Sequence, residues 1–107
     1  MFTHVQHVGD RLEPLRKQLL DRTGTPVNLN SSTVAFRMVA ASDGSVKIND
    51  AAAIIEDGAN GRVRYEWASG DVDTAADYYA WFIRTEGGKV EHYPTGAELI
   101  IHIIPNS

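Results

Sequence analysis

The chain has 107 residues, no cysteine, and 14 acidic against 10 basic side chains, which gives a net charge of −4. Hydrophobic residues make up 43% and charged residues 22%, a balance typical of a globular domain rather than a disordered or fibrous chain. The lack of cysteine excludes disulfides, thiolate metal sites and a cysteine nucleophile. The negative charge argues against binding to nucleic acid, and the longest aliphatic stretch, residues 99–104, is too short to cross a bilayer. We therefore expect one domain over residues 1–107, with residues 1–8 as an N-terminal arm or edge strand and with neither nucleic acid nor a membrane as partner.

The segment over residues 10–21 carries two conflicting patterns. Its leucines recur at helical spacing and acidic residues near its start suit a capping box, which together favour a helix. Read as a strand, the same segment places Leu15, Lys17 and Leu19 on one face, with a proline marking its start or an edge. A resemblance described below favours the strand, so we predict that residues 15–20 are extended.

Turns rich in glycine, asparagine and aspartate divide the rest of the chain into short segments. Several segments alternate between apolar and polar residues or are rich in strand-forming residues, as strands of a half-buried sheet are. Short strands at this spacing are typical of an antiparallel sandwich or barrel. The core between the sheets is predicted to contain one side of three strands: Val34, Phe36, Met38, Val63, Tyr65, Trp67, Ala80 and Phe82.

The last predicted strand, residues 99–104, is apolar on both faces. Its odd-numbered residues are expected to face the core, which leaves Ile100, His102 and Ile104 on the outer face. The outer face of a simple sandwich is normally polar, and exposed branched aliphatic residues on a sheet promote association. We therefore predict an interface at these three residues, and the alternative is that residues 2–8 of the same chain fold over them.

No constellation of residues typical of an enzyme is visible. Two of the four histidines, His4 and His7, are three residues apart but have no third metal ligand nearby. The acidic loop around Asp71, Asp73 and Asp77 does not follow a calcium-loop spacing. No serine lies in a nucleophile elbow, and there is no glycine-rich phosphate loop. We predict no catalytic, cofactor-binding or metal-binding residue and no enzymatic activity.

Aromatic residues are the one group that suits a small ligand. They can form a sugar-stacking platform, but their position among aliphatic neighbours in strands favours packing in the core. A carbohydrate-binding or host-surface adhesion module is therefore the alternative function. The aromatic residues concerned are Tyr65, Trp67, Tyr78, Tyr79, Trp81 and Tyr93.

Read in order, the residues between about 8 and 104 resemble the N-terminal immunoglobulin-like domains of phage baseplate upper proteins. The resemblance also includes a similarity to the immunoglobulin tyrosine corner, in which Asp73-Thr74-Ala75 precedes Tyr78. The matching positions are Leu19, Asp21, Gly24, Pro26, Val27, Leu29, Val34, Phe36, Met38, Asp57, Gly61, Val63, Tyr65, Trp67, Gly70, Asp71, Thr74, Tyr78, Ala80, Phe82, Gly88, Val90, Tyr93 and Pro94.

The resemblance implies an all-β fold, an immunoglobulin-like antiparallel β-sandwich of about seven strands. It also implies a non-catalytic structural protein of a phage virion, assembled in the host cytoplasm. Such a protein attaches to other virion proteins and self-associates in a multi-copy assembly. A place in the baseplate, the tail, the neck or the capsid is equally compatible with the sequence.

Overall fold

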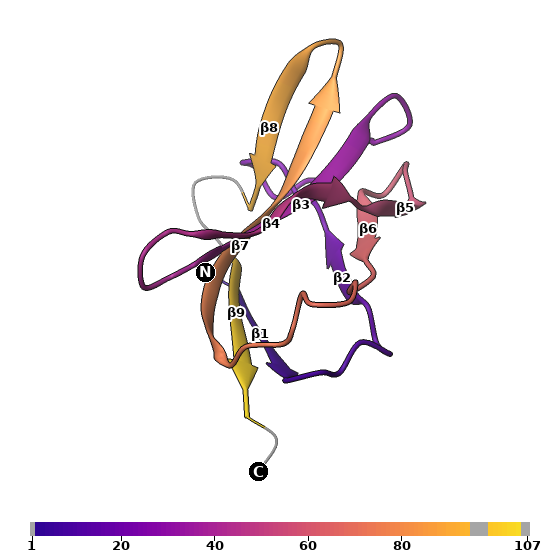
Figure 1. The fold of residues 1–107 in the computed structure, drawn as a ribbon. Coiled ribbons are helices and arrows are strands. Elements are labelled where there is room, and N and C mark those ends of the chain that lie inside the picture. Colours follow the sequence, from indigo (N-terminus) through magenta and orange to yellow (C-terminus); the bar gives the residue numbers. More distant parts are fainter. Residues whose placement is uncertain (1, 95–98, 106–107) are drawn as a thin grey trace.

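The computed structural model describes residues 2–94 and 99–105, and this part of the chain contains nine strands and no helix. No helix long and apolar enough to span a membrane occurs in it. In chain order the strands are β1 (Phe2–His7), β2 (Leu15–Gln18), β3 (Thr33–Ala40), β4 (Val46–Ala52), β5 (Ile54–Asp57), β6 (Arg62–Tyr65), β7 (Ala76–Glu86), β8 (Lys89–Tyr93) and β9 (Leu99–Ile104) (Figure 1).

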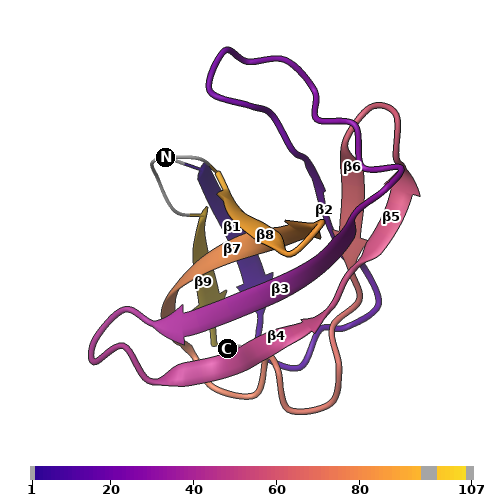
Figure 2. The same cartoon turned by 90° about the horizontal axis from the view of Figure 1, so that it is seen from above.

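The strands form two sheets. The larger sheet has the order β1-β9-β7-β3-β4, and β8 also pairs with β7; the smaller sheet has the order β2-β6-β5. Seen from above, the smaller sheet stands to one side of the larger one (Figure 2). In the described residues every pair is antiparallel except β1 with β9, which is parallel. The two sheets share one hydrophobic core, as the two sheets of a β-sandwich do.

The predicted all-β immunoglobulin-like sandwich is thus confirmed, with two departures. The described part of the chain has nine strands rather than about seven, because β1 adds to the edge of the larger sheet and Gly87-Gly88 turns the chain back into β8. Both of these glycines have positive φ, 57° and 80°, as a tight hairpin turn requires. The sandwich is also not wholly antiparallel, since β1 runs parallel to β9.

Phe36 connects the two sheets at the centre of the core. Its ring lies 4.6 Å from that of Tyr65 in the smaller sheet and 5.0 Å from that of Phe82 in the larger one. All of the predicted core residues are buried, so the predicted facing of these strands is confirmed. The set comprises Val34, Phe36, Met38, Val63, Tyr65, Trp67, Ala80 and Phe82.

Strand β2 resolves the ambiguous segment in favour of the extended form. It pairs antiparallel with β6, with Leu15 opposite Tyr65. Leu15 is buried, and so is Leu19, which follows the strand and donates its amide hydrogen bond to the Gly61 carbonyl. Leu12, which a helix would place beside them, is 99% exposed. The leucines have helical spacing, but the segment is not a helix. Pairing with β6 satisfies its backbone hydrogen-bonding groups instead, and the smaller sheet buries its apolar side chains.

The chain forms a tyrosine corner at the start of β7, as the resemblance implies. The hydroxyl of Tyr78 donates to the carbonyl oxygen of Thr74 at 3.3 Å, and the Tyr78 side chain is buried. This is the same contact that immunoglobulin domains make at the equivalent strand. It fixes the chain where it enters the central strand of the larger sheet.

Candidate interaction surface

Strand β9 presents the three predicted interface residues on the outer face of the larger sheet. Burial alternates along the strand, with Leu99, Ile101 and Ile103 buried and the intervening residues half-buried. Ile100, His102 and Ile104 therefore face away from the core, as the alternation predicts. Their contact with a partner stays a prediction.

Pairing between strands extends this surface across the whole larger sheet. Ile100 lies opposite Tyr79 of β7, Tyr79 opposite Val39 of β3, and Val39 opposite Val46 of β4. We call these four residues the outer row. Val46 is 49% exposed and the other three are half-buried. From the sequence, Ile100 was assigned to an interface and Tyr79 to a possible aromatic platform. Val39 and Val46 were missed, because which residues stand opposite one another depends on a register that sequence alone does not show.

A polar pair lies beside the outer row. His102 Nδ1 is 2.5 Å from Asp77 Oδ1, and the two residues are directly opposite each other on β9 and β7. On the other side of β9, His102 is opposite Val5, which is 55% exposed. The outer face thus combines aliphatic and aromatic side chains with one hydrogen-bonded pair.

Residues 2–8 do not cover this face, so that alternative is wrong. Residues 2–7 form β1, which pairs edge to edge with β9 in parallel register, Thr3 opposite Ile100 and His7 opposite Ile104. Pairing satisfies backbone groups that would otherwise remain open at the edge of β9. Strand β1 therefore widens the outer face instead of shielding it.

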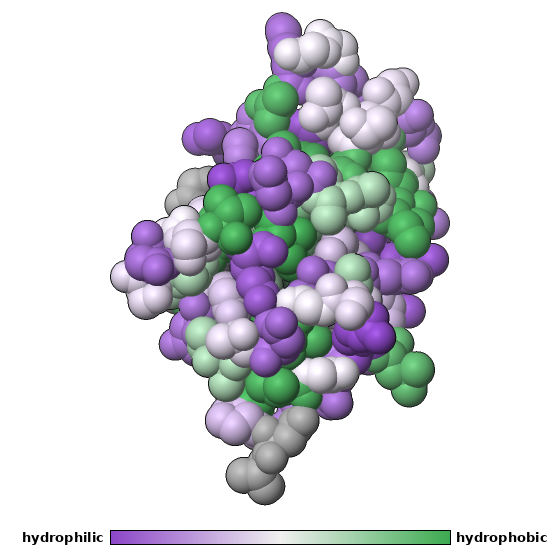
Figure 3. Space-filling view, viewed as in Figure 1, coloured by the Kyte–Doolittle hydropathy of each residue, from purple (hydrophilic) through white to green (hydrophobic). Residues whose placement is uncertain are grey.

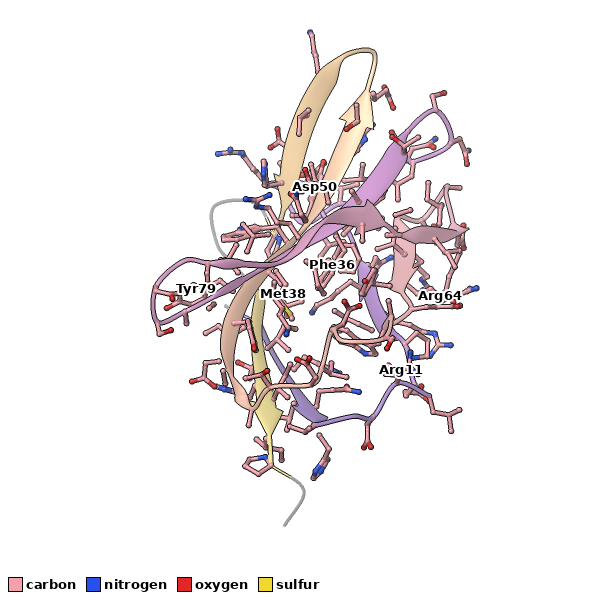
Figure 4. The ribbon with its side chains drawn as sticks, viewed as in Figure 1. Arg11, Phe36, Met38, Asp50, Arg64 and Tyr79 are labelled. Carbon is pink, nitrogen blue, oxygen red and sulfur yellow. The ribbon has the colours of Figure 1, made fainter. Side chains whose placement is uncertain are left out.

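The outer face of the smaller sheet differs in character, because it carries charge. Arg64 contacts Glu56 at 3.1 Å and Glu66 at 3.0 Å, and Arg16 approaches Glu56 at 3.4 Å. Exposed ion pairs of this kind contribute little to stability but keep their surroundings hydrated. Figure 4 shows Arg64 and Tyr79 on opposite sides of the molecule with Phe36 between them.

Four of the six aromatic residues of the predicted platform belong to the core, so they form no exposed platform. Tyr65, Trp67, Tyr78 and Tyr93 are buried. The other two, Tyr79 and Trp81, are half-buried on the outer face of the larger sheet. Only these two remain for contact with a ligand among the six.

The acidic loop forms no common site, because its carboxylates have separate partners. Asp71 accepts hydrogen bonds from the Tyr65 hydroxyl at 2.6 Å and from the Ala68 amide at 2.7 Å, whereas Asp73 pairs with Lys47 at 2.6 Å. The hydrogen bond from Lys47 holds the pKa of Asp73 below its usual value. Residues 2–94 and 99–105 contain no cluster of three or more side chains suited to a metal ion.

No protein-family model and no curated protein matches this sequence. Among solved structures, the chain is similar to the N-terminal domain of phage TP901-1 ORF48, with a TM-score of 0.57 and 17% sequence identity. The match covers 96% of this chain and 83% of the other. At this level of identity the likeness shows a shared β-sandwich fold.

Proposed function

We propose that this protein is a non-catalytic structural module of a phage virion that attaches to another virion protein through the outer face of its larger sheet. Two observations support a phage origin: the resemblance of the ordered motif residues to phage baseplate domains, and the fold shared with a domain of a phage protein. The attachment itself is supported by the outer row.

The outer row carries this proposal because its residues lie outside the core between the two sheets. The core between the sheets is already filled from the inner faces of both sheets, and the inner side of β9 supplies Leu99, Ile101 and Ile103 to it. An outer face in contact with water is expected to be polar, as it is on the smaller sheet. A row of Ile100, Tyr79, Val39 and Val46 is instead typical of the apolar centre of an interface.

Isolated apolar residues elsewhere on the surface do not support the same conclusion. Figure 3 shows apolar side chains reaching the surface in separate patches among hydrophilic ones, which is ordinary for a soluble domain. The outer row differs because its members are adjacent on four paired strands. The His102–Asp77 pair beside it supplies polar groups whose geometry a partner must match, which favours specificity.

The partners that suit this surface are other virion structural proteins, including further copies of the same chain in a multi-copy assembly. The site of attachment in this proposal is the outer row with His102 and Ile104. The location in the particle, at the baseplate, tail, neck or capsid, follows from the partner's identity.

Incorporation into particles tests the proposal. Particles grown from the genome that encodes the chain are purified, and the chain is quantified in them by mass spectrometry. The wild-type chain is expected in particles, whereas the Ile100→Lys, Ile104→Lys variant is expected to fold as a monomer and to be absent from them. Buried lysine ammonium groups without partners strongly disfavour such an interface.

A matched variant separates loss of the interface from added charge. Leu12→Lys with Ile54→Lys also replaces two aliphatic residues by lysine, at positions that are 99% and 40% exposed and lie outside the larger sheet. This variant is expected to enter particles normally. A wild-type chain absent from particles contradicts the virion role, and unfolding of the Ile100→Lys, Ile104→Lys monomer assigns these residues to the domain's own core.

A further inference from the structure

We propose that a groove between the β7–β8 hairpin and strand β4 binds a neutral saccharide. This site goes beyond the proposed virion function and uses different residues from the outer row. The groove has a volume of about 360 Å³, within the range of roughly 300–1,000 Å³ of small-molecule pockets.

The floor and walls of the groove come from four paired strands. Ala35 on β3 and Ile83 on β7 are directly opposite each other, and Ile83 is also opposite His92 on β8. Val90 lines the side that the hairpin forms. Because the groove lies across the face of these paired strands, side chains supply the contacts for a ligand there.

A β-bulge places Asp50, one of the residues that line the groove, opposite Arg37. Between the pairs Phe36↔Ala51 and Met38↔Ile48, strand β4 has one residue more than β3, so Asn49 and Asp50 face the single residue Arg37. Bulges of this kind re-aim side chains and are common beside binding sites. Figure 4 places Asp50 beside the β7–β8 hairpin.

The backbone of Asp50 has the left-handed conformation, with φ of 53°, the one non-glycine residue with positive φ among those described. This conformation is uncommon outside glycine, although aspartate tolerates it better than most residues. Such conformations cluster at ligand sites because the surrounding structure enforces them. At this position the left-handed backbone conformation coincides with a groove that Asp50 itself lines.

The polar groups of the groove suit vicinal hydroxyls. Arg37 Nη1 donates to Asn49 Oδ1 at 2.9 Å and to Asp50 Oδ1 at 3.5 Å, which aligns three planar groups. The Asp50 carboxylate can accept hydrogen bonds from hydroxyl groups, and the remaining guanidinium N–H groups of Arg37 can donate them. Arg37 and Asp50 are the charged residues among the described lining and have opposite signs, so their balance favours a neutral ligand over a phosphate or a cation.

Trp81 is not part of the lining but lies next to two residues that are, Arg37 and His92. Trp81 is opposite Arg37 across β7 and β3, and its ring meets that of His92 edge-on with centroids 6.5 Å apart. A pyranose ring has apolar C–H faces and polar hydroxyl edges, and the lining combines the apolar Ile83 and Val90 with the polar Arg37 and Asp50.

A saccharide titration followed by NMR tests this site. The purified chain is screened on a glycan array and titrated with methyl α-glucoside, methyl β-galactoside, N-acetylglucosamine and rhamnose, with backbone amide shifts as the readout. Binding of at least one saccharide is expected, with shifts concentrated at residues 35–37, 81–85 and 90–92. Trp81 fluorescence is expected to change in parallel.

Asp50→Gly is the decisive variant. Glycine adopts positive φ readily, so the variant is expected to fold at least as stably as the wild-type chain while its saccharide affinity falls at least tenfold. Ile100→Lys, which alters the outer row alone, is expected to bind saccharide normally and thereby separates this site from the proposed virion interface. Absence of binding on the array and in every titration overturns the proposal, as does binding that Asp50→Gly leaves unchanged.

Discussion

At the scale of single residues, Phe36 is where the two sheets meet. It is fully buried and contacts the rings of Tyr65, Trp67 and Phe82. Truncation to alanine removes these contacts and leaves a cavity, so Phe36→Ala is expected to lower the free energy of unfolding by about 3–5 kcal/mol, as measured by urea denaturation. Ile54→Ala at the 40% exposed Ile54 serves as control and is expected to cost far less. A loss below about 1 kcal/mol for Phe36→Ala is too small for a cavity and would place this ring outside the core.

The Tyr65 hydroxyl makes the free energy of unfolding depend on pH in the alkaline range. Burial, and then its hydrogen bond to Asp71, raise the pKa of the Tyr65 hydroxyl above its usual value. The folded state therefore retains the proton while the unfolded state loses it near a pH of about 10. The resulting stabilisation is complete below that pH and is lost as the pH rises further.

The variant Tyr65→Phe isolates this contribution. At neutral pH it loses the hydrogen bond to Asp71, at an expected cost of about 1.5 kcal/mol. Above the pKa of free tyrosine its free energy of unfolding is expected to fall less steeply with pH than that of the wild-type chain. Urea denaturation at a series of alkaline pH values measures both slopes, and equal slopes would contradict the assignment.

At the scale of elements, Gly61 holds the loop that follows β2 against the turn between β5 and β6. Its carbonyl accepts a hydrogen bond from the Leu19 amide at 2.7 Å. Its φ is +69°, and a Cβ there would lie 2.7 Å from the Leu19 oxygen and 2.8 Å from the Val27 oxygen. The position therefore requires glycine for two reasons, backbone conformation and close approach.

Two glycine variants separate these reasons. Gly24 also has positive φ, +86°, but nothing lies within 4 Å of an added Cβ, so Gly24→Ala is expected to cost only the left-handed conformation, about 1–2 kcal/mol. Gly61→Ala is expected to cost this and a further ~1–3 kcal/mol from overpacking. Thermal or urea unfolding measures the loss of stability in each variant. Equal losses would show that the close approach of the Leu19 and Val27 oxygens to Gly61 does not add to the cost.

Some elements were predictable from sequence because they depend on local alternation. The facing of β3, β6 and β9 follows from period-two patterning, since adjacent residues of a strand point to opposite faces. The parallel pairing of β1 with β9 was not predictable, because the strands are far apart in the chain and the alternation of β1 is weak. The leucine spacing of the β2 segment favours a helix locally, but the segment is a strand because it pairs with β6 in the folded protein.

The candidate site was predictable only in part for the same reason. Alternation identified Ile100, His102 and Ile104, but Tyr79 and Val39 join them only through the registers of β7 with β9 and β3. The bulge at Asp50 had a faint indication in sequence, since adjacent asparagine and aspartate tolerate the left-handed conformation. Its place beside the β7–β8 hairpin depends on pairing over long distances in the chain.

At the scale of the whole molecule, the sandwich has two unlike outer faces. The smaller sheet presents the ion pairs of Arg64 and Arg16 with Glu56, and the larger sheet presents the outer row. Association that buries apolar area stabilises a complex, whereas burying the charged face requires desolvation of its ion pairs. We therefore propose that the protein docks by its larger sheet and leaves the smaller sheet in water.

Site-specific photo-crosslinking in assembled particles tests this claim most directly. A benzophenone amino acid replaces Tyr79 in the outer row or, in a second variant, Arg62, which is exposed on the smaller sheet. Irradiation of purified particles is expected to join position 79 to another virion protein or to a second copy of the chain, and to leave position 62 without a crosslink. Crosslinks from position 62 with none from position 79 would contradict the account.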